Sequence, residues 1–261
     1  MTQIVPNIGK VEPLSQGNVH IWQATIDCSG PWLSRAYYSR ILSASEVENY
    51  GGFVDLQAGR EYLLGRIMMR TVLSTYFPHL SAREWHFAFN NHGKPYVRQS
   101  ARRDGLEFSL SHSGGAVVLA LTIGAEIGID LEAHTKTIDI MSLATDVFSR
   151  AEILSLKALG PALARQCFFK FWTLKEAYIK ARGLGLALPL DQFTFRICDG
   201  PPVDDNISIT FASGIHDEPN RWWFSIREFC GHPMALAVKR DGTAEQVLIF
   251  DFDTALSPIG A

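Results

Sequence analysis

The chain has 261 residues, of which 47% are hydrophobic and 20% are charged, and its formal net charge is -3 at pH 7. This length fits one large domain or two lobes of ordinary size, and the apolar content is enough for a substantial core. The small negative charge excludes a generally basic nucleic-acid-binding protein, although it allows a local basic cleft. We therefore expect a globular protein with no nucleic-acid partner.

The start of the chain and its cysteines predict a cytoplasmic protein without a membrane partner. Residues 1–7 carry neither a basic leader nor a continuous apolar region, so we expect no signal peptide. The longest apolar run, residues 116–122, is far too short to span a bilayer. The cysteines lack metal-ligand or redox spacing, which indicates buried thiols in a reducing compartment. They are Cys28, Cys167, Cys198 and Cys230.

The first part of the chain predicts a strand and then two helices. Residues 18–26 alternate in polarity and suit a strand. Ser43 and Glu46 have the spacing of a capping box at a helix start. Residues 57–76 form the best long helix, which Pro78 prevents from extending. Its apolar face is marked at helical spacing by Leu63, Leu64, Ile67, Met68, Val72 and Leu73.

Several short strands follow, with a turn at residues 90–95 after the first of them. The predicted strands are residues 85–89, 107–110, 116–122 and 127–132. Ser149 and Glu152 form a second capping box, which opens a helix that ends near residue 159.

A second long helix is expected at residues 163–181, and four more strands follow at residues 193–197, 207–211, 222–227 and 234–238. Both halves of the chain thus contain helices followed by strands. The sequence predicts an α+β fold with two lobes that meet near residue 124.

The strand at residues 127–132 places two carboxylates on one face. Side chains alternate across a sheet, so Gly128, Asp130 and Glu132 share a face. Two carboxylates at this spacing suit a hard cation such as Mg²⁺, which also accepts phosphate oxygens. The alternative is a solvated polar face on a half-exposed strand.

The second long helix adds an acid and two lysines. Trp172, Glu176 and Lys180 lie on one side of it, and Lys175 is displaced by about 100°. An exposed ion pair between Glu176 and Lys180 is the simple alternative. The helix is otherwise strongly apolar, however, and charged groups on a buried helix need partners. A metal and a diphosphate would provide them.

Residues 111–115 read Ser-His-Ser-Gly-Gly and predict a turn whose backbone amides cradle anionic oxygens. A serine nucleophile activated by His112 is the competing interpretation, but the Gly-x-Ser-x-Gly pattern of a nucleophile elbow is absent from the sequence. Lys94, in a Gly-Lys-Pro-Tyr turn, reads by itself as a solvated lysine. Neither a P-loop motif nor a Gly-x-Gly-x-x-Gly motif occurs.

Four motifs in this order resemble those of the 4′-phosphopantetheinyl transferases. They are Gly-Lys-Pro-Tyr at 93–96, Phe-Ser-Leu-Ser-His-Ser at 108–113, Gly-Ile-Asp-Leu-Glu at 128–132 and Trp-Thr-Leu-Lys-Glu-Ala-Tyr-Ile-Lys at 172–180. The length resembles the two-lobed, broad-specificity (surfactin-synthetase-type) class that serves fatty-acid, polyketide and nonribosomal peptide synthesis. The resemblance covers about residues 40 to 197.

This resemblance implies two similar α+β lobes in a pseudo-two-fold arrangement, with the active site at their interface, and a monomer. Residues 1–124 would form the lobe on the adenosine side of coenzyme A. Residues 125–261 would carry the metal and the catalytic residues. The implied reaction is a Mg²⁺-dependent transfer of the 4′-phosphopantetheine arm of coenzyme A to a serine of an acyl or peptidyl carrier protein. Adenosine 3′,5′-bisphosphate would be released, as with a holo-[acyl-carrier-protein] synthase.

The resemblance also implies roles for individual residues. Three acids would bind the metal, namely Asp130, Glu132 and Glu176. Glu176 would also be the general base, and Lys180 and His112 would complete the catalytic set by contacting phosphates. The coenzyme A contacts would be Lys94, Ser111, His112, Arg60, Lys175 and Lys180, with the role of Lys175 left open between phosphate and structure.

One departure from the family pattern concerns the adenosine end of coenzyme A. Residues 48–53 contain no Lys or Arg, where family members often carry basic residues. Arg60 fits the position of a 3′-phosphate contact. Arg40, Arg66 and Arg70 are candidate substitutes, with a solvated or structural role as the equal alternative for Arg66 and Arg70. Two other functions use the same side chains: a Mg²⁺-dependent phosphohydrolase acting on a nucleotide diphosphate, and a non-catalytic module that binds coenzyme A or a carrier.

Overall fold

The computed structural model describes residues 11–26, 30–98, 105–134, 137–197, 207–239 and 246–252. The predictions for residues 1–7, Cys28 and Cys198 lie outside these ranges. Within them, no helix has both the length and the apolar character needed to cross a membrane.

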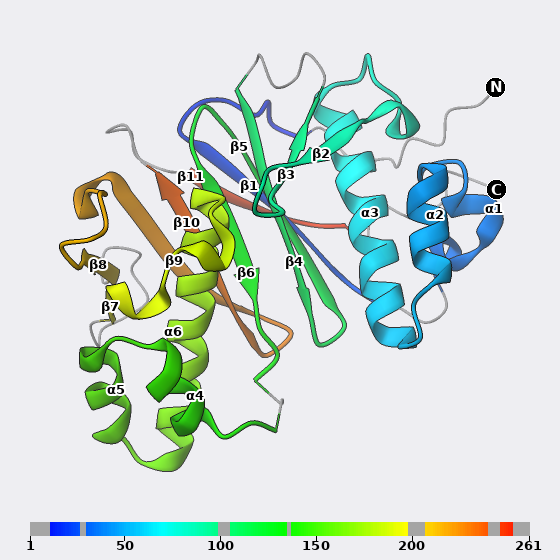
Figure 1. Cartoon of the computed structure of the whole chain (residues 1–261). Helices are drawn as coiled ribbons and strands as arrows, with labels where there is room; N and C mark the ends of the chain where they lie inside the picture. Colours follow the sequence, from blue (N-terminus) through cyan, green and yellow to red (C-terminus); the bar gives the residue numbers. More distant parts are fainter. Residues whose placement is uncertain are drawn as a thin grey trace. The chain divides into compact units, whose positions relative to one another are not determined.

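The chain divides into two compact units, and both contain helices and sheets, which confirms the α+β class (Figure 1). Unit 1 comprises Met1–Ala88, Pro95–Gly124 and Ala244–Ala261, and unit 2 comprises Phe89–Lys94 and Ala125–Thr243.

Unit 1 is built on a four-stranded sheet with the order β11-β1-β5-β4. Its strands are β1 (Asn18–Thr25), β4 (Leu106–Ser113), β5 (Ala116–Ile123) and β11 (Gln246–Asp251). Neighbouring strands are antiparallel except for β11, which runs parallel to β1. The predicted first lobe ended at residue 124, whereas β11 brings the end of the chain into unit 1 because it pairs with β1.

The long helix α3 (Leu56–Tyr76) packs on β4 and β5 and covers the core of unit 1. All six residues of its predicted apolar face are fully buried. Asp55 caps its start, since the Asp55 side chain accepts a hydrogen bond from the Ala58 amide. The shorter helices are α1 (Arg35–Tyr38), α2 (Ala44–Gly51) and the 3₁₀ turns η1 (Pro31–Leu33) and η2 (Ala82–Glu84). The capping box predicted at Ser43 and Glu46 is present at the start of α2.

Two short strands, β2 (Phe87–Phe89) and β3 (Pro95–Val97), pair as a two-stranded sheet. Gly93 and Lys94 of the Gly-Lys-Pro-Tyr motif lie in the turn between them, and Pro95 and Tyr96 begin β3. Residues Phe89–Lys94 belong to unit 2.

Unit 2 contains a three-stranded antiparallel sheet with the order β6-β10-β9. The strands are β6 (Ile127–Leu131), β9 (Trp222–Phe229) and β10 (His232–Lys239). The long helix α6 (Pro161–Arg182) packs against β6 and β10 (Figure 1). Unit 2 thus repeats the plan of unit 1, a long helix laid on a largely antiparallel sheet.

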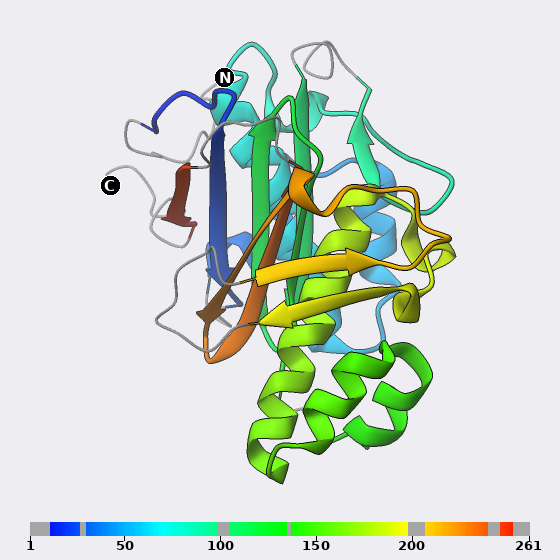
Figure 2. The same cartoon turned by 90° about the vertical axis from the view of Figure 1, so that its left-hand side faces the viewer.

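The remaining elements of unit 2 enclose the other sides of α6. They are α4 (Ile140–Val147), α5 (Arg150–Lys157), the 3₁₀ turns η4 (Gly185–Ala187), η5 (Leu190–Gln192) and η7 (Pro219–Arg221), and strands β7 (Phe193–Ile197) and β8 (Ile207–Phe211). Figure 2 shows β7 and β8 side by side as an antiparallel pair. The capping box predicted at Ser149 and Glu152 opens α5. Helix α4, which the sequence analysis did not predict, begins where Asp139 caps its first turn.

Candidate active site

Strand β6 turns its acidic face toward α6, and a glycine makes the approach close. A Cβ on Gly128 would lie 2.0 Å from the carbonyl oxygen of Ala177 and 2.4 Å from the amide nitrogen of Ala181. Only a residue without a side chain allows the backbones to approach this closely. Because Gly128 and Asp130 share a face of β6, the same contact brings the carboxylate of Asp130 to α6.

Asp130 and Lys180 form an ion pair between the strand and the helix. Lys180 Nζ lies 2.7 Å from Asp130 Oδ1. The Asp130 side chain is 5% exposed, whereas that of Lys180 is 30% exposed and so reaches solvent. Lys180 therefore bonds to the strand, and it also lowers the pKa of Glu176 on its own helix.

Glu176 lies one helical turn before Lys180, and its surroundings change its acidity. Burial, assisted by the negative charges of Asp130 and Glu132, raises the pKa of Glu176 to about 6, while Lys180 lowers it. A carboxylate with a pKa near neutrality is suited to accept a proton under ordinary conditions. The structure therefore brings Asp130, Glu132, Glu176 and Lys180 into one electrostatic cluster within unit 2.

The donor chemistry of this cluster fits a hard divalent cation. Carboxylate oxygens are the ligands that Mg²⁺ prefers, and a cation would offset the repulsion that raises the pKa of Glu176. In the described part of the chain, no three Asp, Glu, His or Cys side chains are already grouped as a metal cluster. An ion held by these acids would share the charge of Asp130 with Lys180.

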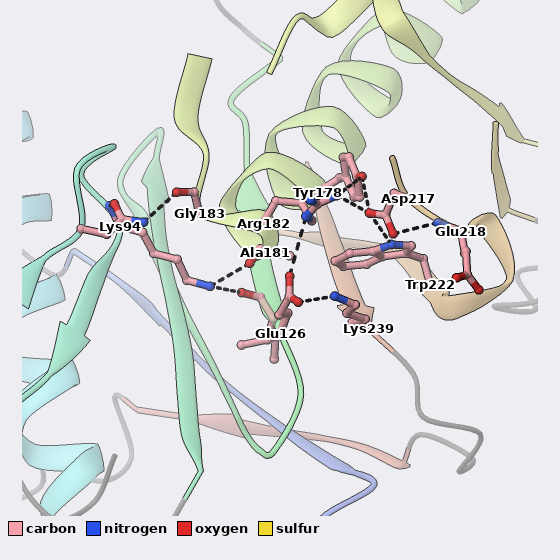
Figure 3. Close-up of polar contacts among 12 residues, drawn as sticks. Lys94, Glu126, Tyr178, Ala181, Arg182, Gly183, Asp217, Glu218, Trp222 and Lys239 are labelled. Carbon is pink, nitrogen blue, oxygen red and sulfur yellow. Dashed lines mark hydrogen bonds and ion pairs between the residues drawn. The ribbon is translucent and has the colours of Figure 1, made fainter. Parts of the chain in front are cut away.

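Lys94 contacts the C-terminal end of α6. Its Nζ donates to the carbonyl oxygens of Ala181 (2.9 Å) and Ile127 (3.3 Å), and the neighbouring Asn90 donates to that of Gly183 (2.7 Å) (Figure 3). The last carbonyls of a helix have no partners within the helix and favour nearby positive charge. Lys94 therefore caps α6, in a position that the sequence alone read as a solvated turn.

A second group of polar residues, which the sequence analysis missed, holds the same end of α6. Asp217 Oδ2 accepts hydrogen bonds from Tyr178 Oη (2.7 Å) and Trp222 Nε1 (3.0 Å), and it also pairs with Arg182 (Figure 3). Glu126 pairs with Lys239 and with Arg182. These contacts tie the last turn of α6 to the loop before η7 and to the sheet. The sequence signal that could have indicated this group is the spacing of Tyr178 and Arg182, four residues apart on the helix.

Lys175 lies inside unit 2 rather than on its surface. Its side chain is 1% exposed, and Nζ lies 2.9 Å from Glu152 Oε2. The same ammonium donates to the carbonyl oxygens of Leu190 (2.8 Å) and Phe193 (2.6 Å). Three acceptors match the three protons of an ammonium group. Of the two roles that the sequence left open for Lys175, this geometry favours the structural one over coenzyme A binding.

Unit 1 holds Ser111 and His112, and the turn expected around them is shorter than predicted. Strand β4 continues to Ser113, so the backbone of residues 111–113 pairs with β5. The amide of Gly115 donates to Glu61 Oε1 at 2.7 Å. One of the amides expected to cradle an anion, that of Gly115, is therefore already bound to Glu61.

Ser111 and His112 point to opposite faces of β4, as neighbours on a strand must. Ser111 is buried, whereas the His112 side chain is 42% exposed. His112 Nδ1 lies 2.9 Å from Glu61 Oε2. Sequence reasoning missed Glu61, although an acid on the apolar stripe of α3, one turn before Gly65, was a usable signal.

Three arginines of helix α3 differ in their surroundings. Arg60 is half-buried in the second turn of α3. Arg70 is fully buried, pairs with Glu46 at 2.8 Å and donates to the carbonyl oxygen of Trp85 at 3.0 Å. Arg66 lies over the ring of Tyr62 at 5.1 Å. Arg70 is therefore a structural residue and no substitute for a phosphate contact.

Comparison with known sequences identifies the family of this chain. Residues 126–228 match the 4′-phosphopantetheinyl transferase superfamily, and residues 32–123 match the N-terminal region of 4′-phosphopantetheinyl transferases. The protein belongs to the 4′-phosphopantetheinyl transferase family.

Individual relatives give the same result. The 4′-phosphopantetheinyl transferase HetI of Nostoc sp. is 32% identical, over 67% of this chain and 72% of its own length. Sfp of Bacillus subtilis is 31% identical over 62% of this chain and 74% of its own. The psf-1 transferase of Bacillus pumilus is 35% identical over 76% of this chain and 79% of its own.

Proposed function

We propose that this protein transfers the 4′-phosphopantetheine arm of coenzyme A to a serine of an acyl or peptidyl carrier protein, in a Mg²⁺-dependent reaction. The observation that carries this proposal is the cluster of Asp130, Glu132, Glu176 and Lys180, in which the pKa of Glu176 is raised to about 6. Membership of the family and relatives named as phosphopantetheinyl transferases support it.

The carrier serine needs a base, and Glu176 is suited to that role. Its carboxylate would accept the hydroxyl proton as the serine oxygen bonds to the phosphorus that carries pantetheine. The bond from that phosphorus to the bridging oxygen breaks, and adenosine 3′,5′-bisphosphate leaves with the bond's electrons. General-base assistance of this kind contributes about 10²–10⁴-fold.

Positive charge would stabilise the phosphate oxygens as the bond breaks. Asp130, Glu132 and Glu176 are the residues that would hold Mg²⁺, which when bound neutralises charge on the diphosphate. Lys180 Nζ, half-exposed beside Asp130, would donate to a phosphate oxygen, and His112 of unit 1 would do the same. Positioned charge of this kind usually makes the largest contribution to such reactions.

Three further residues would contact coenzyme A. Arg60 keeps the proposed 3′-phosphate contact, and Ser111 keeps a proposed contact through its backbone or hydroxyl. Lys94 would contact coenzyme A while its Nζ stays bound to the carbonyl oxygen of Ala181 at the end of α6. The protein would act in the cytoplasm as a monomer, with broad carrier specificity.

The test is intact-mass analysis of an apo carrier incubated with the protein, coenzyme A and Mg²⁺. The expected result is the addition of one phosphopantetheine to the carrier, with none in EDTA. No addition across a panel of acyl and peptidyl carriers, despite measurable coenzyme A binding, would refute the transfer. Release of phosphopantetheine without a carrier would instead identify a phosphohydrolase.

A further inference from the structure

Glu61 is a buried carboxylate in unit 1 for which the proposed reaction has no direct use. Its side chain is 8% exposed. Oε2 lies 2.9 Å from His112 Nδ1, and Oε1 accepts from the Gly115 amide (2.7 Å) and from Gln57 Nε2 (3.1 Å). Both oxygens therefore have partners, of which His112 lies near the end of β4 and Gly115 in the turn between β4 and β5.

The packing of α3 on β4 explains how Glu61 reaches His112. A Cβ on Gly65 would lie 3.1 Å from Leu110 Cδ2, so helix and strand are in close contact there. Four residues of helix advance about 6 Å, and two residues of strand advance about 6.6 Å. Moving from Gly65 to Glu61 and from Leu110 to His112 therefore keeps the two elements in step. The contact is a product of regular secondary structure, which makes it rigid.

We propose that Glu61 is a positioning residue for His112, which fixes the imidazole with Nδ1 toward α3 and Nε2 available to a phosphate group. The bond made by one ring nitrogen determines which tautomer is present and which nitrogen a ligand meets. A carboxylate only accepts hydrogen bonds, so Nδ1 must carry a proton. When the ring is protonated, Nε2–H is the donor left for an anionic oxygen.

The charge of Glu61 fits this role. Burial by itself would raise the pKa of Glu61, but hydrogen bonds from His112, Gln57 and Gly115 outweigh burial and hold it below its usual value. The carboxylate thus stays ionised at neutral pH and remains an acceptor. Through Gly115 it also fixes the turn that follows His112.

The inference rests on the proposed function in one respect, that His112 meets a phosphate of coenzyme A. The tautomer of His112 can be measured without any ligand. In ¹⁵N NMR spectra of the whole protein, assigned with an His112→Ala variant, we expect the Nδ1–H form of the neutral ring. Glu61→Gln keeps the shape of the side chain, and its amide oxygen can still accept from Gly115. The NH₂ group of the new side-chain amide would then face His112 Nδ1, so the proton of the neutral imidazole should move to Nε2.

Kinetics test the consequence for transfer. Loss of a group that orients another typically costs 10–100-fold, so we expect Glu61→Ala to lower kcat/KM for coenzyme A by about 10- to 100-fold. The double variant with His112→Ala should be no slower than His112→Ala alone, because Glu61 acts through that ring. Gln57→Ala is the matched control, since it removes a partner of Glu61 without touching His112, and it should transfer at nearly the wild-type rate.

Two results would overturn the inference. One is a Glu61→Gln variant with an unchanged His112 tautomer and unchanged kcat/KM. The other is a double variant whose loss is the product of the two single losses, as expected for a purely structural Glu61. If the wild-type protein transferred nothing, the proposed function would fail, while the NMR experiment would still decide whether Glu61 orients His112.

Discussion

Lys180 holds Asp130 across the contact between α6 and β6, with Nζ 2.7 Å from Oδ1. The pair joins two groups that the proposed reaction needs at the same place, one for a metal and one for a phosphate. Without ligands, each satisfies the charge of the other. With ligands, each would exchange part of this contact for the substrate, so neither group is left without a partner of opposite charge.

Asp130→Asn should abolish transfer without unfolding the protein. Asparagine has nearly the same shape and can still accept a hydrogen bond from Lys180, but it is a poor ligand for Mg²⁺ compared with a carboxylate. We expect kcat/KM to fall by at least about 10²-fold, with a melting temperature close to that of the wild type. The carrier mass-shift assay and calorimetry measure the two effects. Asp146→Asn, an exposed change in α4, is the control; near-normal transfer by Asp130→Asn would refute the metal role.

Glu176→Gln should stabilise the metal-free protein while stopping the reaction. The pKa of Glu176 is raised to about 6 by burial first and by Asp130 and Glu132 in addition, so its charged form is disfavoured in the folded state. The unfolded chain releases this proton at lower pH than the folded one, and wild-type stability should therefore fall as pH rises from about 4.5 to 6. The loss would be at most about 2 kcal/mol, at about 1.4 kcal/mol per pKa unit.

The measurement is the free energy of unfolding in EDTA at pH 4 and at pH 7.5. The variant should match the wild type at the lower pH and exceed it at the higher one, and Mg²⁺ should stabilise the wild type more than the variant. An equal pH dependence in both proteins would show that Glu176 titrates normally.

Lys175→Met should damage folding more than coenzyme A binding. The change leaves Glu152 buried without its ammonium partner, and breaking a buried pair from one side typically costs about 3–5 kcal/mol. Denaturant unfolding measures the loss, and Lys170→Met, on the same helix and half-buried, is the matched control. The KM for coenzyme A of the folded Lys175→Met fraction should stay near that of the wild type. A stable variant with a strongly raised KM would assign Lys175 to coenzyme A instead.

Gly128→Ala should separate α6 from β6. The new methyl group would meet backbone atoms of α6, with the nearest at 2.0 Å, and backbone cannot move aside as a flexible side chain can. Overpacking of this kind costs about 1–3 kcal/mol or more, and it should also weaken the Asp130–Lys180 pair and transfer. Gly214→Ala, in an exposed turn of the same unit, meets nothing within 4 Å and should be neutral in both thermal unfolding and transfer. Wild-type stability of Gly128→Ala would contradict the close packing described here.

Local patterns predicted much of the fold. Both long helices and both capping boxes depend on residues within a few positions of each other, and the structure contains all four. Strand β11 was missed because its partner β1 lies more than 200 residues earlier, and no local pattern records a parallel pairing. The length of β4 was underestimated because Ser, His and Gly were read as a turn, whereas pairing with β5 overrides that preference.

In the site too, local patterns predict some features, and others depend on contacts between distant parts of the chain. The faces of β6 and α6 follow from periodicity, whereas the expectation that Asp130, Glu176 and Lys180 lie together came from the resemblance to the family. The partners of Lys175 and Lys94 were not accessible from the sequence, because Glu152, Leu190, Phe193 and Ala181 reach them only through tertiary packing. Motif membership therefore identified these lysines without indicating which chemistry each performs.

The parallel pairing of β1 with β11 also has a consequence for synthesis on the ribosome. Every strand of the unit 2 sheet is translated before Gln246–Asp251 emerges, whereas unit 1, which begins first, still has an open edge at β1 until then. Unpaired strand edges attract other chains. The unit whose translation begins first therefore has its sheet completed last, and its β1 edge stays open to other chains if translation stops early.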